Sequence, residues 1–161
     1  MNFQAEKRVV RACYDALDGA EADDIGGALA QFYAPDCLWR GFHPFGELTG
    51  PDSVAARFWQ PLRSSLTRLQ RRMDIFMAGA NELDGDQSKW VVSMGHLMGL
   101  FDQPWLGIAP TGKMVMLRYA EFNRVENGRI TEVAMYFDIP HLMMQAGLQP
   151  FPPQTAAHMV Q

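Results

Sequence analysis

Hydrophobic positions recur at helical spacing through the first third of the chain. From residue 5 to residue 17 an apolar side chain returns every three or four positions, with charged residues between: Val9, Val10, Cys13, Tyr14 and Leu17. That period predicts an amphipathic helix. Asp23 or Asp24 can cap a second helix, whose apolar positions are Ile25, Leu29, Phe32 and Tyr33. We expect it to end before Pro35, because proline disfavours helical geometry in the preceding residue.

A third helix is predicted from Pro51, since proline suits the first turn of a helix. Its apolar positions are Val54, Phe58 and Leu62, and Pro61 is expected to end or kink it. After residue 65 the helical period gives way to long β-prone runs at residues 66–77, 89–101, 113–125 and 129–138. This segregation of helices from strands predicts an α+β fold with a curved antiparallel sheet, rather than alternating β-α-β units.

The dipeptide Asn127-Gly128 is the strongest local signal in the chain. Both central positions of a type I′ turn need a positive φ, which Asn and Gly tolerate, so a tight hairpin is predicted here. Pro140 can start a short closing helix over residues 141–146, and Gly147 can end it. Residues 1–147 then form one domain, and residues 148–161 form an extended tail containing prolines.

The hairpin turn also predicts which side chains share a face of the sheet. With Glu126 opposite Arg129, one face carries Tyr119, Glu121, Tyr136 and Asp138. The other carries Met116, Ala120, Phe122, Val133, Met135 and Phe137, together with Arg118 and Arg124. We expect the first face to line a pocket closed by the first and third helices, and the second to pack against another subunit.

Distances along this ladder limit the chemistry. Glu121 and Asp138 would lie about 14 Å apart, so they cannot share one proton as a carboxylate dyad. A turn centred within residues 102–111 would set His96 beside Leu117 and in one row with Asp138, about 10 Å away. The two side chains could then act on one bound molecule, whereas a slip of one residue would turn His96 to the other face.

Each of these candidates has a structural alternative. His96 is a satisfied structural histidine or a pocket residue, and the flanking Gly95 and Gly99 leave room for a ligand. Asp138 lies in an apolar run, where an unpaired carboxylate has a raised pKa, but it can also cap the helix at Pro140. The remaining candidates for substrate contact are Trp39, His43 and Trp105, with core or loop packing as the alternative. Trp105 lies in a long loop and is a candidate lid.

Composition narrows the choice of partner. The formal charge of −4 and the absence of a basic concentration argue against nucleic acid. Charged residues interrupt the N-terminal segment and every apolar run is short, so we expect a cytoplasmic protein without a membrane span. Cys13 and Cys37 lack metal-ligand spacing and are expected to be buried free thiols.

Several short motifs together resemble the SnoaL-like polyketide cyclases of the nuclear transport factor 2-like superfamily. The motifs are Gly95-His96, the segment from Gly107 to Lys113, the hairpin from Phe122 to Ile130, Asp138 and the segment Gln145-Ala146-Gly147. The order of elements, with N-terminal helices, a curved sheet and a short terminal helix, is also similar.

The resemblance implies a cone-shaped fold, commonly dimeric, whose deep pocket uses no metal and no organic cofactor. In the cyclases a pocket aspartate is a general acid and base for aldol closure, with a histidine nearby, which corresponds to Asp138 and His96 here. Tyr119, Glu121, Tyr136, Trp39, His43 and Trp105 would then contact substrate. The expected ligand is a small apolar or aromatic molecule containing a carbonyl group, and the expected assembly is a homodimer formed through the sheet.

Two functions remain open at this point. The first is a cofactor-independent cyclase, isomerase or lyase, in which Asp138 removes a proton beside a carbonyl and His96 or a tyrosine stabilises the enolate. The second is a non-catalytic binding or accessory protein of the same fold, in which Asp138 only caps a helix.

Overall fold

The computed structural model describes residues 2–153 and confirms an α+β fold. Its helices are α1 (Gln4–Gly19), α2 (Ile25–Ala30), α3 (Pro51–Val54), α4 (Gln60–Ser65) and α5 (Ile139–Gln145). A 3₁₀ turn (Ala22–Asp24) precedes α2, and a π-helical segment (Ala55–Trp59) joins α3 to α4. The third predicted helix therefore continues past Pro61, which occupies the first turn of α4, where its missing N–H costs little. The predicted tail beyond residue 153 lies outside the described residues.

The described strands form one six-stranded sheet in the order β2-β1-β6-β5-β4-β3. Their bounds are β1 (Tyr33–Phe42), β2 (Gly46–Thr49), β3 (Leu66–Ala80), β4 (Lys89–Phe101), β5 (Met114–Glu126) and β6 (Arg129–Phe137). The sheet is mixed rather than antiparallel, because β1 runs parallel to β6. The second predicted helix was too long, since α2 stops at Ala30 and Tyr33 already opens β1.

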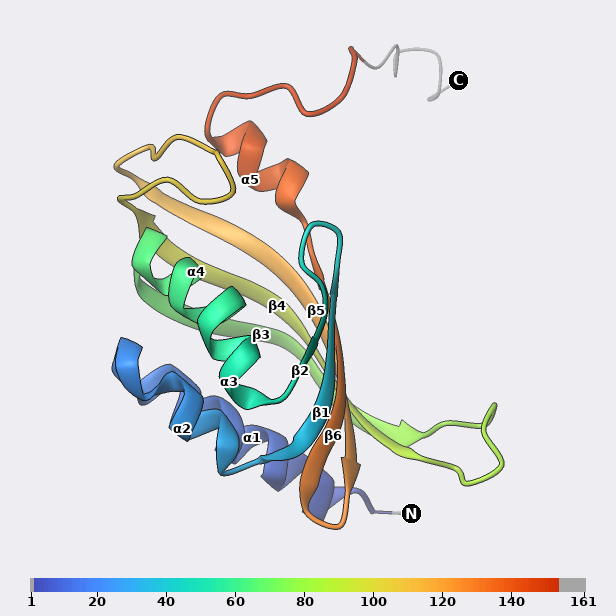
Figure 1. The fold of residues 1–161 in the computed structure, drawn as a ribbon. Helices are drawn as coiled ribbons and strands as arrows, with labels where there is room; N and C mark the ends of the chain where they lie inside the picture. Colours follow the sequence, from blue (N-terminus) through green and yellow to red (C-terminus); the bar gives the residue numbers. More distant parts are fainter. Residues whose placement is uncertain (1, 154–161) are drawn as a thin grey trace, which may run out of the picture.

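The sheet is curved, and helices α1 to α4 lie over its inner face (Figure 1). The strands do not close into a barrel, because β2 and β3 are its two edges. Helix α5 lies at one end of the cone, close to the β4–β5 loop (Figure 1). This loop, the β1–β2 turn and α5 surround the wide end of the cone, which we call the mouth.

The β5–β6 hairpin has the predicted turn but not the predicted faces. Asn127 and Gly128 have φ values of 50° and 75°, and Glu126 pairs with Arg129. One step further, Val125 pairs with Ile130 while Arg124 pairs with Glu132, so Thr131 is an unpaired bulge residue. Past this bulge the register is shifted by one residue. Every side chain of β6 beyond it therefore points to the face opposite the one predicted.

The shifted register changes which side chains share a face of the sheet. Tyr119 pairs with Phe137 and Glu121 with Met135, so these four side chains share the inner face. Tyr136 pairs with Ala120 on the outer face, and the prediction that it lies with Tyr119 and Glu121 is wrong. Val133, Met135 and Phe137 were predicted to face another subunit, but they contribute to the interior instead.

The core fills the space between α1 to α4 and the inner face of the sheet. Helix α1 contributes the side chains that its period predicted: Val10, Cys13, Tyr14 and Leu17. Cys13 and Cys37 are buried free thiols, as expected. None of the helices in the described part of the chain is long and apolar enough to cross a membrane.

Candidate functional site

A carboxylate lies inside the core on the inner face of β5. Glu121 is 2% exposed, and the Tyr14 hydroxyl of α1 donates a hydrogen bond of 2.6 Å to its Oε2 atom. Arg71 of β3 approaches the same oxygen, with its Nη1 atom 3.8 Å away. Buried charges need partners of this kind, because transferring an unpaired ion out of water is costly. Three elements far apart in the sequence thus meet at one carboxyl group.

Arg71 is held from several sides. Its Nε and Nη2 atoms donate to the Asp18 carboxylate at 2.9 and 3.2 Å, a two-point pairing typical of guanidinium with carboxylate. The guanidinium lies over the ring of Tyr14 at 4.0 Å and near Tyr119 and Trp59 at 5.5 and 5.6 Å. Such ring contacts attract a cation. Its side chain is only 4% exposed, so this charge belongs to the interior.

A bulge explains why Arg71 points inward. On β3, Thr67 pairs with Leu100 and Gln70 with Met98, so Arg68 and Leu69 together oppose one residue of β4. Arg68 has a positive φ of 53° at this bulge. The extra residue reverses the alternation, and a second register shift after Met73 restores it. Without the bulge, Arg71 would have faced the outside of the sheet.

The environment pulls the pKa of Glu121 in two directions. Burial raises the pKa of the Glu121 carboxyl by disfavouring its charged form, while the Arg71 charge and the Tyr14 hydrogen bond oppose that rise, and the net direction is upward. Burial also raises the pKa of the Tyr14 hydroxyl well above its ordinary value, so Tyr14 stays protonated and donates. A carboxyl group with a raised pKa suits general acid and base chemistry near neutral pH.

Further polar side chains extend this network, which we call the inner polar cluster: Tyr14, Asp18, Arg71, Ser93, Tyr119, Glu121 and Asn123. Asn123 Nδ2 donates to the Tyr14 hydroxyl at 3.3 Å. The hydroxyls of Ser93 and Tyr119 are hydrogen-bonded at 2.7 Å. Both contacts are buried, which concentrates hydrogen-bonding groups in an otherwise apolar interior.

Aromatic rings connect this cluster to the mouth. Trp59 packs on Phe58 with ring centroids 4.8 Å apart, and Phe58 packs on Phe45 at 5.0 Å. Phe45 in turn lies 5.9 Å from Trp105 of the β4–β5 loop. Phe45 and Trp105 also line a groove of about 620 Å³ at the mouth. A continuous series of rings therefore runs from the surface to Arg71.

The predicted catalytic pair lies on the other side of the sheet. His96 pairs with Arg118, not with Leu117 as predicted, so it faces outward, with its Nδ1 atom 3.7 Å from Asp74 Oδ2. Asp138 accepts a hydrogen bond of 3.1 Å from the backbone N–H of His141, which caps α5, and its own N–H donates to Arg118. His96 and Asp138 do line one outer groove, of about 780 Å³.

The other predicted contact residues are divided between the two faces. Tyr119 and Glu121 belong to the inner polar cluster. Tyr136 is 49% exposed on the outer face and stacks on Phe42 at 4.3 Å. Trp39 is fully buried in the core, Trp105 lines the mouth groove, and His43 is exposed in the β1–β2 turn. The structure thus brings only two of the predicted contact residues to the inner polar cluster.

Sequence reasoning missed Arg71, Tyr14 and Asp18. Tyr14 was identified as an apolar helix position, which it also is, and its place opposite Glu121 follows only from how α1 packs. Arg71 is one of several arginines in β3, and the bulge that selects it leaves no clear sequence signal.

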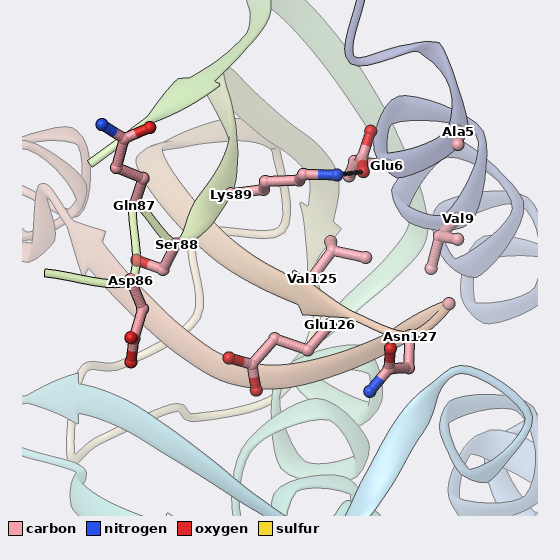
Figure 2. Close-up of a pocket in the computed structure, with 11 residues that line it drawn as sticks. Ala5, Glu6, Val9, Asp86, Gln87, Ser88, Lys89, Val125, Glu126 and Asn127 are labelled. Carbon is pink, nitrogen blue, oxygen red and sulfur yellow. Dashed lines mark hydrogen bonds and ion pairs between the residues drawn. The ribbon is translucent and has the colours of Figure 1, made fainter. Parts of the chain in front are cut away.

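A further hollow lies at the opposite end of the cone. It measures about 370 Å³ and lies between α1, the β3–β4 loop and the β5–β6 turn, as Figure 2 shows. Here Glu6 is paired with Lys89 at 2.9 Å, which lowers the pKa of the Glu6 carboxyl. Among residues 2–153 no group of three potential metal ligands occurs. The inner polar cluster remains the candidate site.

Comparisons with known proteins identify the family and the fold of this chain. The family model for the SnoaL-like domain matches residues 10–133. No curated protein is significantly similar to the chain.

Several solved structures have the same fold. A proposed SnoaL-like polyketide cyclase from Jannaschia is 22% identical, with a TM-score of 0.66 over 92% of this chain and 94% of that one. AclR, a proposed hydroxylase from Streptomyces galilaeus, is 16% identical, with a TM-score of 0.71 over 98% and 90%. IdmH, a proposed polyketide cyclase from Streptomyces antibioticus, is 18% identical, with a TM-score of 0.69 over 90% and 99%.

Proposed function

Because the chain belongs to the family of SnoaL-like domains, we propose that it binds a small, largely apolar carbonyl compound inside the cone and transfers a proton on it. The reaction class is that of a cofactor-independent cyclase, isomerase or lyase. Solved structures of the same fold include proposed polyketide cyclases and a proposed hydroxylase, which supports a small organic ligand. The residue that performs the transfer is Glu121.

One observation carries this assignment. Glu121 is a fully enclosed carboxyl whose pKa is raised by burial, and Tyr14 and Arg71 face the same oxygen. A structural explanation accounts for the carboxylate of Asp138, since it caps α5. Glu121 caps no helix within residues 2–153; its partners are the buried Tyr14 and Arg71, inside a core that also contains Val125, Val133 and Met135. A buried ion pair is weak support for stability alone, which favours a functional role.

The proposed chemistry uses these groups in a simple sequence. Glu121 removes a proton from the carbon next to the ligand carbonyl; the C–H electrons form a carbon–carbon double bond, and the carbonyl π electrons move to its oxygen. Arg71 stabilises the resulting negative charge. In a ligand with a double bond beside the enolate, Glu121 returns the proton to the far carbon and the carbonyl re-forms. Alternatively, the enolate carbon attacks a second carbonyl, whose oxygen takes the proton from Glu121 as the first carbonyl re-forms. In the third case, the carbonyl re-forms as a leaving group departs from the β-carbon and takes that proton. These outcomes correspond to an isomerase, a cyclase and a lyase.

We propose that a ligand enters from the mouth groove, along the series of aromatic rings. Phe45 and Trp105 line the groove, and Phe45 contacts Phe58, which contacts Trp59 beside Arg71. A flat apolar ligand replaces these ring contacts with its own as it enters. Trp105 lies in a loop, where a lid residue is commonly found.

The outer groove offers a second proposal. His96 and Asp138 line the same hollow with Arg118 and Tyr136, so a ligand there would meet an imidazole and a carboxylate together. This arrangement keeps the acid and base pair of the sequence-based hypothesis. The outer groove and the Glu121 site are alternative active sites, because they lie on opposite faces of the sheet.

The test uses 2-tetralone, a flat bicyclic ketone, in D₂O. If the protein is a proton-transfer enzyme, it accelerates deuterium uptake at the carbons beside the carbonyl, which NMR follows directly. Binding of the ketone without accelerated exchange would favour the non-catalytic alternative. The Glu121→Gln and Asp138→Asn variants decide which carboxylate is the base.

We also propose that two copies pair through the outer face of the sheet. That face carries large exposed apolar side chains, among them Ile75, Met77, Met94 and Tyr136, which are 43%, 56%, 46% and 49% exposed. These residues lie on β3, β4 and β6 of the same sheet, and Met77 and Tyr136 line an apolar groove of about 500 Å³. An exposed apolar surface of this kind is typical of an interaction site.

A further inference from the structure

Three buried polar atoms around Glu121 have no hydrogen bond within the described part of the chain. They are Arg71 Nη1, Trp59 Nε1 and Asn123 Oδ1. The Arg71 side chain is 4% exposed, and Trp59 and Asn123 are each 1% exposed. Buried polar groups in folded proteins nearly always have a partner, because leaving one unpaired carries the full cost of removing it from water. Buried donors gathered near one carboxyl group suit a bound molecule that carries an acceptor atom.

Contacts through Arg71 and Tyr14 join these three side chains. Arg71 Cζ lies 5.6 Å from the Trp59 ring, and Arg71 Nη1 lies 3.8 Å from Glu121. Asn123 is joined to Glu121 through the Tyr14 hydroxyl. The Nε and Nη2 atoms of Arg71 already bind Asp18, so Nη1 is the part of this guanidinium turned toward the interior. The Nη1 donor of Arg71 thus lies beside the proposed base, and the Trp59 ring packs against the same guanidinium.

The charges around Arg71 determine which kind of oxygen these donors can bind. The single positive charge of Arg71 already faces two carboxylates, those of Asp18 and Glu121. A third carboxylate, brought by the ligand, would be repelled by Glu121 and would have to lose its water as well. A neutral carbonyl oxygen accepts the same hydrogen bonds without that repulsion.

We propose that Arg71 Nη1 and Trp59 Nε1 together bind the carbonyl oxygen of a neutral ketone beside Glu121. This deepens the proposed function and rests on it, because it names the substrate class and the two donors. When Glu121 takes the proton, negative charge develops on that oxygen, and donors already in place stabilise it without reorganising. Trp59 is the specificity-determining residue of the pair, since its only N–H donor has no partner within residues 2–153, whereas the Arg71 guanidinium also binds Asp18.

The experiment measures the affinity of three ligands of similar shape by isothermal titration calorimetry. They are 2-tetralone, tetralin, which lacks the oxygen, and tetralin-2-carboxylate, which is anionic. We expect the ketone to bind more tightly than either of the others. Trp59→Phe keeps an aromatic ring but removes the N–H. It should therefore weaken binding of the ketone about three- to tenfold and leave the affinity for tetralin unchanged.

Two controls keep the result interpretable. Trp90→Phe removes an indole on the outer face, where Nε1 already donates to Ser88, and should leave ketone affinity unchanged. Glu121→Gln removes the repelling charge and should narrow the gap between ketone and carboxylate. A thermal melt shows that each variant is folded.

The proposal is overturned if the ketone and tetralin bind equally, if Trp59→Phe weakens both equally, or if none of the three ligands binds. Its failure is distinct from that of the proposed function. Deuterium exchange that depends on Glu121 but not on Trp59 would leave Glu121 as the base and remove only the two donors.

Discussion

The two faces of one sheet carry opposite arrangements of polar and apolar groups. On the inner face of β5, Tyr119, Glu121 and Asn123 are buried, and their hydrogen bonds connect them to α1 and β4. On the outer face, the polar groups form small separate pairs, such as Arg40 with Glu132 and Arg124 with Glu126. Between those pairs, large apolar side chains remain exposed.

This contrast indicates a different role for each face, proton transfer for the inner one and subunit contact for the outer one. Burial and neighbouring charges shift the pKa values of polar groups, because water is not there to screen them. The inner face is therefore suited to proton transfer. Exposed apolar groups gain free energy by leaving water, which makes the outer face suited to a second subunit. Alternate residues of the same strands therefore serve different purposes, and each prediction below tests one side of the contrast against the other.

The largest expected effect is on catalysis. Glu121→Gln should slow deuterium exchange into 2-tetralone by about 10²- to 10⁴-fold, the usual contribution of a general base. Asp138→Asn should leave the rate near that of the wild type, because asparagine still caps α5. NMR in D₂O measures both variants. The reverse ordering of the two variants would move the base to the outer groove, where His96→Gln should then also slow exchange.

A pair of methionines compares the packing of the two faces. Met135 is fully buried on the inner face, and Met135→Ala should lower the free energy of unfolding by about 2–5 kcal/mol. Met94 is 46% exposed on the outer face, and Met94→Ala should cost under about 1 kcal/mol. Urea denaturation of each variant at low protein concentration gives the comparison. Equal losses would mean that the outer face is as well packed as the inner one.

The oligomeric state of the protein depends on the outer face alone. We expect the wild type to be a dimer at micromolar concentration, and Met77→Glu to weaken association about tenfold or more, since a charge would be buried at the interface. Leu83→Glu is the matched control, because Leu83 is 97% exposed in the loop between β3 and β4 rather than on the sheet face. Sedimentation velocity distinguishes these states. A monomeric wild type would contradict the pairing.

The smallest effect concerns the pH dependence of stability. Burial raises the folded-state pKa of Glu121 above its ordinary value of 4.5. The folded protein then holds that proton to higher pH than the unfolded chain does, so the wild type loses stability as pH rises from 4.5 through the folded-state pKa. Glu121→Gln lacks this contribution. The difference in unfolding free energy, variant minus wild type, should therefore grow over that window in denaturation at several pH values.

The sequence by itself determined the elements whose signals are local. The period of α1, the proline that opens the third helix, the four long strands and the Asn127-Gly128 turn were all predicted at or near their observed positions. Each depends on residues within a few positions of one another, such as alternating burial or a turn that needs positive φ. The α+β class followed from their order, and the resemblance to the family followed from several short motifs together with that order.

Only the tertiary structure decided which side chains meet. Strand β1 pairs with β6, which lies far along the chain, and its sequence was in part assigned to a helix. The bulges at Arg68 and Thr131 each insert one residue, and a single residue reverses every later side chain on a strand. They bring Arg71 inward to Glu121 and send Tyr136 outward. A bulge arises from the pairing of two strands, so the local pattern of either strand does not specify it.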